Sequence, residues 1–218
     1  MITLLKSLEP DYLQGNYQVF INKLLEMKDS LPRDIFHLNL GTGQIKLAMY
    51  GPARYNLEMA KAYGLNNDIL RNNLAHINEH IGQQVGGIDS GVFNQLFFFI
   101  RELSLQSILL CCLAISLVVL ILFWRRLIRN FTPLMLILLC AYTPLACKWG
   151  VDSQYKLGIV LEEITLYEGP SAIFKDIGKI SSGYKVLLKN TAEGWGLLVY
   201  PVYKTGWVNL RNIGIIDI

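Results

Sequence analysis

The chain has 218 residues, of which 52% are hydrophobic and 17% are charged, and its formal net charge is +3. This composition is too apolar for an ordinary soluble protein, although long polar stretches are present. The small, scattered positive charge and the lack of a basic patch with interleaved aromatic residues argue against nucleic-acid binding. We therefore expect a chain that combines membrane segments with polar domains.

Residues 1–81 are predicted to form helical hairpins. One helix is expected from Asp34 to near Ala48, and the Gly51-Pro52 pair then breaks the chain and starts a second helix that stops at Gly64. Small residues in this region allow the two helices to approach closely, and these are Gly41, Ala53 and Ala60.

This helical region also contains an internal repeat. The triplet Asn39-Leu40-Gly41 is echoed 34 residues later by Asn73-Leu74-Ala75. A period of 34 with a Leu-Gly, Tyr and Ala pattern resembles the tetratricopeptide repeat. We interpret residues 1–81 as one complete repeat, a partial repeat before it, and a polar capping helix from about Asp68 to Ile81. Such helix pairs bury one face only by stacking, so a short array needs caps or a partner.

The capping helix contains a possible metal motif. His76, Glu79 and His80 fit the letters of the inverted zinc-peptidase signature H-x-x-E-H, with the two histidines on one helix face. A catalytic zinc also needs a third protein ligand, and no carboxylate follows on a neighbouring soluble helix. We therefore predict no metal site and no cofactor, with a zinc peptidase as a remote alternative.

Two apolar runs lie between residues 103 and 148, after a glycine-rich joint at 82–102. The first, Ser104 to Trp124, contains no charge and is long enough as a helix to cross a bilayer core of about 30 Å. The second, Phe131 to Cys147, is at the short end of the spanning range, and Trp149 at its margin is expected to lie at the interface. We predict a transmembrane helical hairpin.

All four cysteines fall in these runs, where they are expected to be small packing residues between the two helices. The connection at 125–130 carries three arginines, Arg125, Arg126 and Arg129. Positive charge in a short loop favours the cytoplasm, so both termini are expected on the far side, the periplasm of a Gram-negative cell. The first ten residues show no signal peptide, so we expect either that a start upstream of Met1 has been lost or cleaved or that the orientation is inverted.

Residues 149–218 are predicted to form a small all-β barrel. Apolar and β-branched runs are expected as strands at Gly158–Tyr167, Tyr184–Lys189, Trp195–Tyr200 and Gly206–Leu210, separated by Gly, Pro and Asn turns. Five or six short strands ending in Gly-Trp-Val resemble a bacterial SH3 domain.

A tetratricopeptide unit, a two-helix membrane hairpin and an SH3-like barrel, in that order, resemble the BatE-type proteins of bacterial Bat (aerotolerance) operons. The stretch HLNLGTGQIKLAMYGPARYNLEMAKAYGLNNDILRNNLAHI is similar to their repeat. The resemblance implies a non-catalytic scaffold subunit of an inner-membrane complex linked to stress tolerance or envelope integrity. The implied partners are von Willebrand factor A-domain membrane proteins, other Bat-type subunits, membrane lipid and, indirectly, a MoxR-type AAA+ ATPase.

The residues themselves agree with a role in binding. No nucleophile–base pair, phosphate loop or paired carboxylates are evident, so we predict that the chain is not an enzyme. The residues expected to contact a partner around the repeat groove are Asn39, Tyr50, Arg54 and Asn73. An aromatic groove on the barrel is expected from Tyr167, Trp195, Tyr203 and Trp207, and the alternative for both tryptophans is packing in the barrel core or edge. The main alternative function is cell-wall (peptidoglycan) binding through the barrel.

Overall fold

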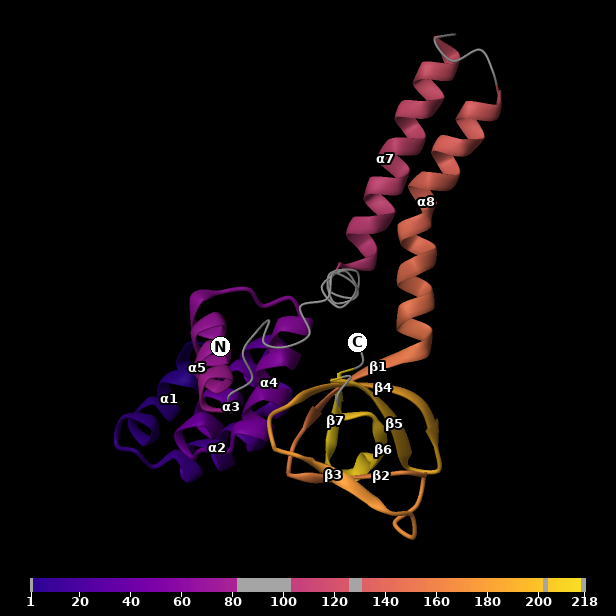
Figure 1. Ribbon diagram of the computed structural model, residues 1–218. Helices are drawn as coiled ribbons and strands as arrows, with labels where there is room; N and C mark the ends of the chain where they lie inside the picture. The colour runs from indigo at the N-terminus through magenta and orange to yellow at the C-terminus, as the bar shows by residue number, and fades with distance from the viewer. Residues whose placement is uncertain (1, 82–102, 126–130, 202–203, 217–218) are drawn as a thin grey trace. The chain divides into compact units, whose positions relative to one another are not determined.

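The computed structural model describes residues 2–81, 103–125, 131–201 and 204–216 (Figure 1). The chain divides into two compact units. One unit combines the N-terminal helices with the C-terminal sheet, and the other contains two long apolar helices. The predicted glycine-rich joint at 82–102, together with Arg126, Arg129 and Tyr203, lies outside the described residues.

Five α-helices form the part of the chain described between residues 2 and 81, and the last three correspond to the predicted helices (Figure 1). Their bounds are α1 Ile2–Leu13, α2 Tyr17–Glu26, α3 Arg33–Lys46, α4 Tyr50–Ala62 and α5 Asp68–His80, with a short 3-10 turn at Lys28–Ser30. The start of α5 has a side-chain cap, because the Asn67 side chain accepts a hydrogen bond of 2.9 Å from the Leu70 amide.

The helices pack pairwise around two apolar clusters. Leu8, Leu24 and Phe36 centre the first cluster, in which α1 and α2 pack against α3. Leu57 and Ile77 centre the second, which α3, α4 and α5 share. The predicted close approach of α3 and α4 is confirmed, since a β-carbon at Gly41 would lie 2.8 Å from Leu57 Cγ, and Ala53 and Ala60 are fully buried.

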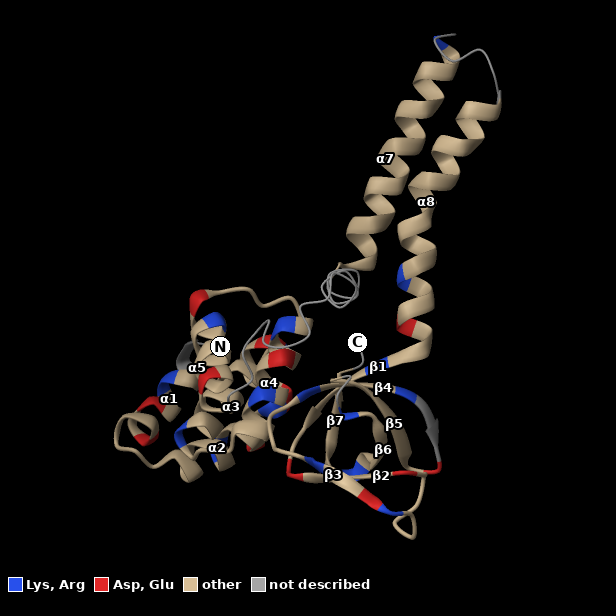
Figure 2. Cartoon of the chain, viewed as in Figure 1, with Lys and Arg blue, Asp and Glu red and all other residues tan. Residues whose placement is uncertain are grey.

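The described residues of the second unit form an antiparallel pair of helices, α7 Leu105–Trp124 and α8 Phe131–Gln154. Both are long and apolar enough to cross a membrane. Figure 2 shows how few charged residues they carry. The Ser104 side chain caps α7 by accepting a hydrogen bond of 3.0 Å from the Ser107 amide. In α8 the helix runs on to Gln154, beyond the predicted boundary at residue 148, because no glycine–proline break follows the apolar run.

Only one of the four cysteines packs between these helices. The Cys112 thiol is buried and donates a hydrogen bond of 3.2 Å to the Ala141 carbonyl of α8. Cys111, Cys140 and Cys147 are exposed, so the prediction that all four pack between the helices is wrong for these three.

The C-terminal part is a seven-stranded sheet in the order β3-β2-β6-β5-β4-β1-β7. Its strands are β1 Tyr155–Val160, β2 Ile164–Tyr167, β3 Asp176–Ile180, β4 Lys185–Ala192, β5 Trp195–Tyr200, β6 Gly206–Asn209 and β7 Ile213–Ile216. Neighbouring strands are antiparallel wherever their register is defined, for example Leu157 opposite Ile216 and Leu197 opposite Trp207. The sheet curls around a core that includes Ile159, Ile180 and Leu198, all fully buried (Figure 1).

Two strands were not predicted. The expected single run Gly158–Tyr167 is two strands, β1 and β2, and β3 and β7 were absent from the prediction. β3 carries exposed charges and a bulge opposite Leu166–Tyr167, so it lacks the alternation of a half-buried strand. Its bulge and charges are also features that protect a sheet edge from pairing with other chains.

Candidate functional site

A pocket of about 460 Å³ lies among the N-terminal helices. Helices α1 and α3 form its sides, and α2 and the first turn of α5 complete it. The lining residues are Leu5, Lys6, Glu9, Tyr12, Phe20, Leu38, Asn39, Thr42 and Ile69. Most of these side chains are apolar, and a few polar groups lie among them, which is the composition of a site that binds a segment of polypeptide or a small ligand.

Hydrogen bonds orient two polar residues of this pocket, Asn39 and Thr42. Asn39 Nδ2 donates to the Ile35 carbonyl at 2.8 Å. Thr42 Oγ1 donates to the Leu38 carbonyl at 2.8 Å and accepts from Asn73 Nδ2 at 2.8 Å. Asn39 thus lines the pocket, and Asn73 supports its wall from α5. These two predicted contact residues lie at the same groove.

The other two residues predicted at this groove lie elsewhere. Tyr50 is half-buried at the start of α4, where its ring stacks on His80 with 5.0 Å between the centroids. Arg54 is 5% exposed and faces the sheet. The prediction of Arg54 as a partner-contact residue of the groove is therefore wrong, because its guanidinium is already enclosed by another part of the chain.

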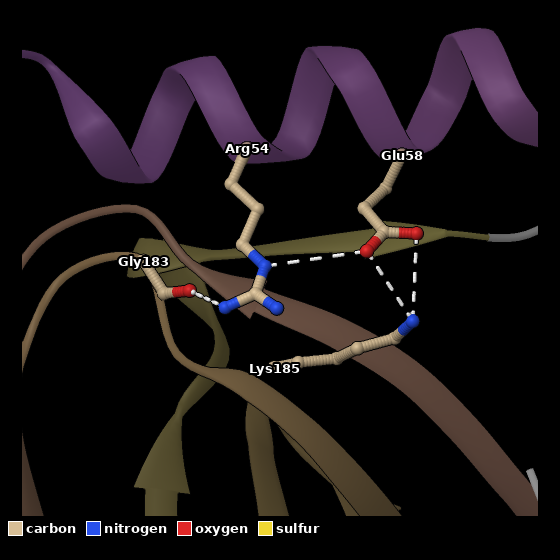
Figure 3. A network of polar contacts seen from close by, with 4 residues as sticks. All are labelled: Arg54, Glu58, Gly183 and Lys185. Atoms are coloured by element: carbon tan, nitrogen blue, oxygen red, sulfur yellow. Dashed lines mark hydrogen bonds and ion pairs between the residues drawn. The ribbon is translucent and has the colours of Figure 1, made fainter. Parts of the chain in front are cut away.

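Arg54 belongs to a buried ionic contact between α4 and the sheet (Figure 3). Its Nη1 donates to the Gly183 carbonyl at 2.7 Å, and its Nε lies 4.0 Å from Glu58 Oε1. Lys185 Nζ lies 3.3 Å and 3.4 Å from the two oxygens of Glu58. The Glu58 carboxylate thus faces two cations, and all three side chains are largely shielded from solvent.

Burial and neighbouring charges shift the pKa values of Glu58 and Arg54 in this contact. Burial by itself raises the pKa of Glu58, but the positive charges of Lys185 and Arg54 hold that pKa below its ordinary value. Burial lowers the pKa of Arg54, and the Glu58 charge opposes this effect. An arginine has so high an ordinary pKa that the guanidinium stays protonated. The network is therefore ionised at neutral pH.

The backbones of α4 and the sheet approach closely beside this network. A β-carbon at Gly51 would overlap the Leu161 carbonyl and the Ser182 hydroxyl, and would lie 2.7 Å from the Val160 carbonyl. On β7, Gly214 faces the ring of Tyr55. Glycine at position 51 is therefore required by the contact between the two parts, and not by a turn.

Aromatic residues form a row on the outer surface of the sheet. Tyr167 on β2 is opposite Trp207 on β6, and Trp207 is opposite Leu197 on β5. The rings of Tyr167 and Trp195 meet edge to face with 5.5 Å between the centroids. All three aromatic side chains are half-buried, so the structure brings together the three described members of the predicted groove.

The histidines of the predicted zinc motif make ring contacts with each other. His76 and His80 meet edge to face with 4.5 Å between the centroids, and His80 also stacks on Tyr50. Within the described ranges, no group of three or more His, Cys, Asp or Glu side chains is placed to hold a metal ion.

Comparison of the chain with protein-family models, with curated proteins and with solved structures gives no match.

Sequence reasoning missed Glu58 and Lys185. The available signal was the Arg54–Glu58 pair at i, i+4 on a helix whose neighbouring positions are small or apolar, namely Ala53, Leu57 and Ala60. That pattern is equally typical of an exposed helix face, so the sequence alone does not separate a surface ion pair from a buried one.

Proposed function

We propose that this chain is a non-catalytic, membrane-anchored adaptor that binds a segment of a partner protein in the groove between α1, α3 and α5. The observation that carries the proposal is the pocket itself, in which Ile69 is 57% exposed beside the oriented amide of Asn39. An exposed apolar side chain at a concave, largely apolar surface is typical of a binding site.

The finer fold assignments belong to the same proposal. The helix pair α3–α4 followed by α5 supports a tetratricopeptide-like unit, because Asn39 and Asn73, 34 residues apart, occupy corresponding positions on α3 and α5. The small curled antiparallel sheet with a Gly-Trp-Val strand supports an SH3-like domain. These two assignments, with the hairpin between them, support the resemblance to BatE-type proteins.

We further propose that α7 and α8 cross the inner membrane of a bacterium. In their most apolar windows only 17% and 6% of the residues are buried, whereas a core helix of a soluble protein is mostly buried. Exposed Trp124 and Trp149 lie toward the C-terminal ends of α7 and α8, as interfacial anchors do. Arg125 and the two arginines after it favour a cytoplasmic loop, which places both termini in the periplasm.

The proposed partners are von Willebrand factor A-domain membrane proteins of a Bat-type assembly, which contact a MoxR-type AAA+ ATPase on the cytoplasmic side. The test is extraction of C-terminally tagged protein in mild detergent, followed by mass spectrometry of the proteins that co-purify. Stoichiometric recovery of von Willebrand factor A-domain proteins is expected. Recovery of the chain alone would overturn the assembly.

A matched pair of variants tests the groove within that experiment. Ile69→Glu places a charge in the pocket, whereas Leu25→Glu changes an apolar residue of similar exposure, 48%, on α2 and outside the pocket lining. Both sites are exposed, so both variants should fold. We expect partner recovery to fall with Ile69→Glu and to persist with Leu25→Glu, and equal recovery would refute the groove as the binding site.

The row of aromatic side chains favours a second candidate, binding of cell-wall glycan or peptide through the sheet. Tyr167 and Trp195 offer adjacent rings of the kind that contact sugars and peptides. Sedimentation of the detergent-solubilised protein with purified sacculi tests this function. Binding that disappears with Tyr167→Ala and survives Ile69→Glu would favour the wall over the groove.

A further inference from the structure

Helix α4 is buried on two different faces. Ala53, Leu57 and Ala60 face the helical core that α4 shares with α3 and α5. Arg54 and Glu58 face the sheet, where they are also buried. The sheet therefore covers a helix face that the N-terminal helices leave open. The helical part and the sheet belong to one compact unit, whereas the predicted boundaries place residues 1–81 and 149–218 in separate domains.

The contact joins parts of the chain that flank both apolar helices. Arg54 and Gly183 are 129 residues apart, and Glu58 and Lys185 are 127 residues apart. Residues 105–124 and 131–154 lie between them. If these helices span a membrane, a single crossing would leave the two halves of the contact on opposite sides. Charged groups do not meet across a bilayer core, so the contact forms only after an even number of crossings.

We propose that the outward face of α4 docks on the 182–185 turn and strand β7 of the same chain, and that in a chain whose first span has crossed the membrane this docking requires the second span to cross as well. In such a chain the contact between α4 and the sheet forms after the second span has inserted. The inference rests on the proposed function only in taking α7 and α8 as membrane spans.

The chemistry of the surface sets what it accepts. Arg54 requires a carbonyl, which the turn supplies at Gly183, and Glu58 requires a cation, which is Lys185. The ring of Tyr55 packs against the backbone of Gly214, where a β-carbon would overlap the ring. Three different requirements on one helix face make the docking specific for this turn and strand, because a partner lacking any of them leaves a buried charge unpaired or a ring without space.

A cross-link measures docking in the full chain within native membranes. Ile81→Cys and Ser182→Cys place thiols on the two sides of the contact, since a β-carbon at the adjacent Gly183 would lie 3.1 Å from Ile81 Cγ2. The four native cysteines are replaced by serine, and a short bis-maleimide joins the new pair. A protease site in the 126–130 loop then separates linked from unlinked halves on a denaturing gel. We expect most of the protein to be linked.

Blocking one crossing should abolish the cross-link. Leu136→Arg with Leu139→Arg puts two charges on exposed positions of α8, and the same two positions changed to valine provide the control. We expect at least a tenfold lower yield for the arginine variant and full yield for the valine variant. An undiminished yield in the arginine variant would overturn the inference.

Charge exchange tests the surface without touching the spans. Glu58→Lys and Lys185→Glu should each lower the cross-link several-fold, and the double variant should recover part of it, because the ion pair between positions 58 and 185 is restored while the cation at position 58 now lies beside Arg54. Single variants with normal yield, or a double variant as poor as the singles, would overturn the proposal. The charge-exchange experiment leaves α8 unchanged, so it still tests the proposal if the arginine variant of α8 is degraded in the cell.

The orientation in the membrane is tested separately. Combining Arg125→Glu, Arg126→Glu and Arg129→Glu should favour the inverted hairpin. Labelling of Ser182→Cys by a membrane-impermeant thiol reagent then reports on which side of the membrane the sheet lies. Both halves move together, so the cross-link is expected to persist. If the unmodified chain has its sheet on the cytoplasmic side, the proposed periplasmic location is refuted and the docking proposal stands. If the cross-link is lost in a correctly inserted chain, the docking proposal alone is refuted.

Discussion

Removal of the Glu58 carboxylate is the sharpest test of the contact between α4 and the sheet. The Glu58 side chain is 9% exposed, and its partners Arg54 and Lys185 are 6% and 17% exposed. Glu58→Gln keeps the shape of the side chain and removes the negative charge that Arg54 and Lys185 share in a closed interface. Breaking a buried ion pair from one side costs roughly 3–5 kcal/mol, and because water reaches part of Lys185 we expect about 3 kcal/mol.

The measurement is thermal unfolding of the purified protein in mild detergent, followed by tryptophan fluorescence, to which Trp195 and Trp207 of the sheet contribute. For a unit of this size each kcal/mol shifts the Tm by about 2–4 °C, so a shift of about 9 °C is expected. The matched control is Glu163→Gln, which removes a carboxylate 2.8 Å from Lys179 in a pair that is 56% and 60% exposed.

The control should leave the Tm nearly unchanged, because water and salt screen an exposed pair. If Glu58→Gln lowers the Tm no more than Glu163→Gln does, the buried network does not hold the sheet on α4. The reasoning from burial would then be refuted, whatever the distances between the charged atoms.

Gly51→Ala should lower the free energy of unfolding by about 1–3 kcal/mol in the same assay, because the new β-carbon would overlap the Leu161 carbonyl. Gly150→Ala is the control and should not lower it, because nothing lies within 4 Å of a β-carbon there. Equal effects would contradict the close approach of α4 and the sheet. The lowered pKa of Glu58 predicts that its stabilisation is present above its ordinary pKa of 4.5 and is lost as the pH falls through the lower folded value, and Glu58→Gln should flatten this part of a Tm-against-pH profile. Burial lowers the pKa of His37 despite its hydrogen bond to Asn56, so the stability that the neutral imidazole contributes is present above pH 6.5 and is lost as the pH falls below it. A His37→Gln variant should therefore show a weaker dependence of Tm on pH in that range.

Much of the secondary structure could be predicted because its signals are local. β5 coincides with the predicted strand Trp195–Tyr200, and α5 matches the predicted cap to within one residue. β3 could not be predicted in this way, since its exposed, charged residues form a strand only through pairing with β2. The end of α8 was missed because helix and strand meet at Gln154–Tyr155 without a residue that marks the boundary.

The candidate site was predictable only in part. Asn39 and Asn73 were found because a repeat period places them on equivalent turns of neighbouring helices. Phe20 and Ile69 also line the pocket, yet an apolar residue that lines a groove has the same sequence pattern as one that packs in a core. The aromatic row on the sheet depends on strand register, and register is set by long-range pairing such as Tyr167 with Trp207.

The sequence by itself determined the two apolar helices, the helical hairpins and the strand-rich end of the chain, because length, hydropathy and periodicity act over short stretches. Only the tertiary structure decided that Arg54 and Glu58 are interior residues. An i, i+4 ion pair looks the same in sequence whether water or a distant strand covers it. Its burial depends on Gly183 and Lys185, more than a hundred residues away, and on the close approach that Gly51 permits.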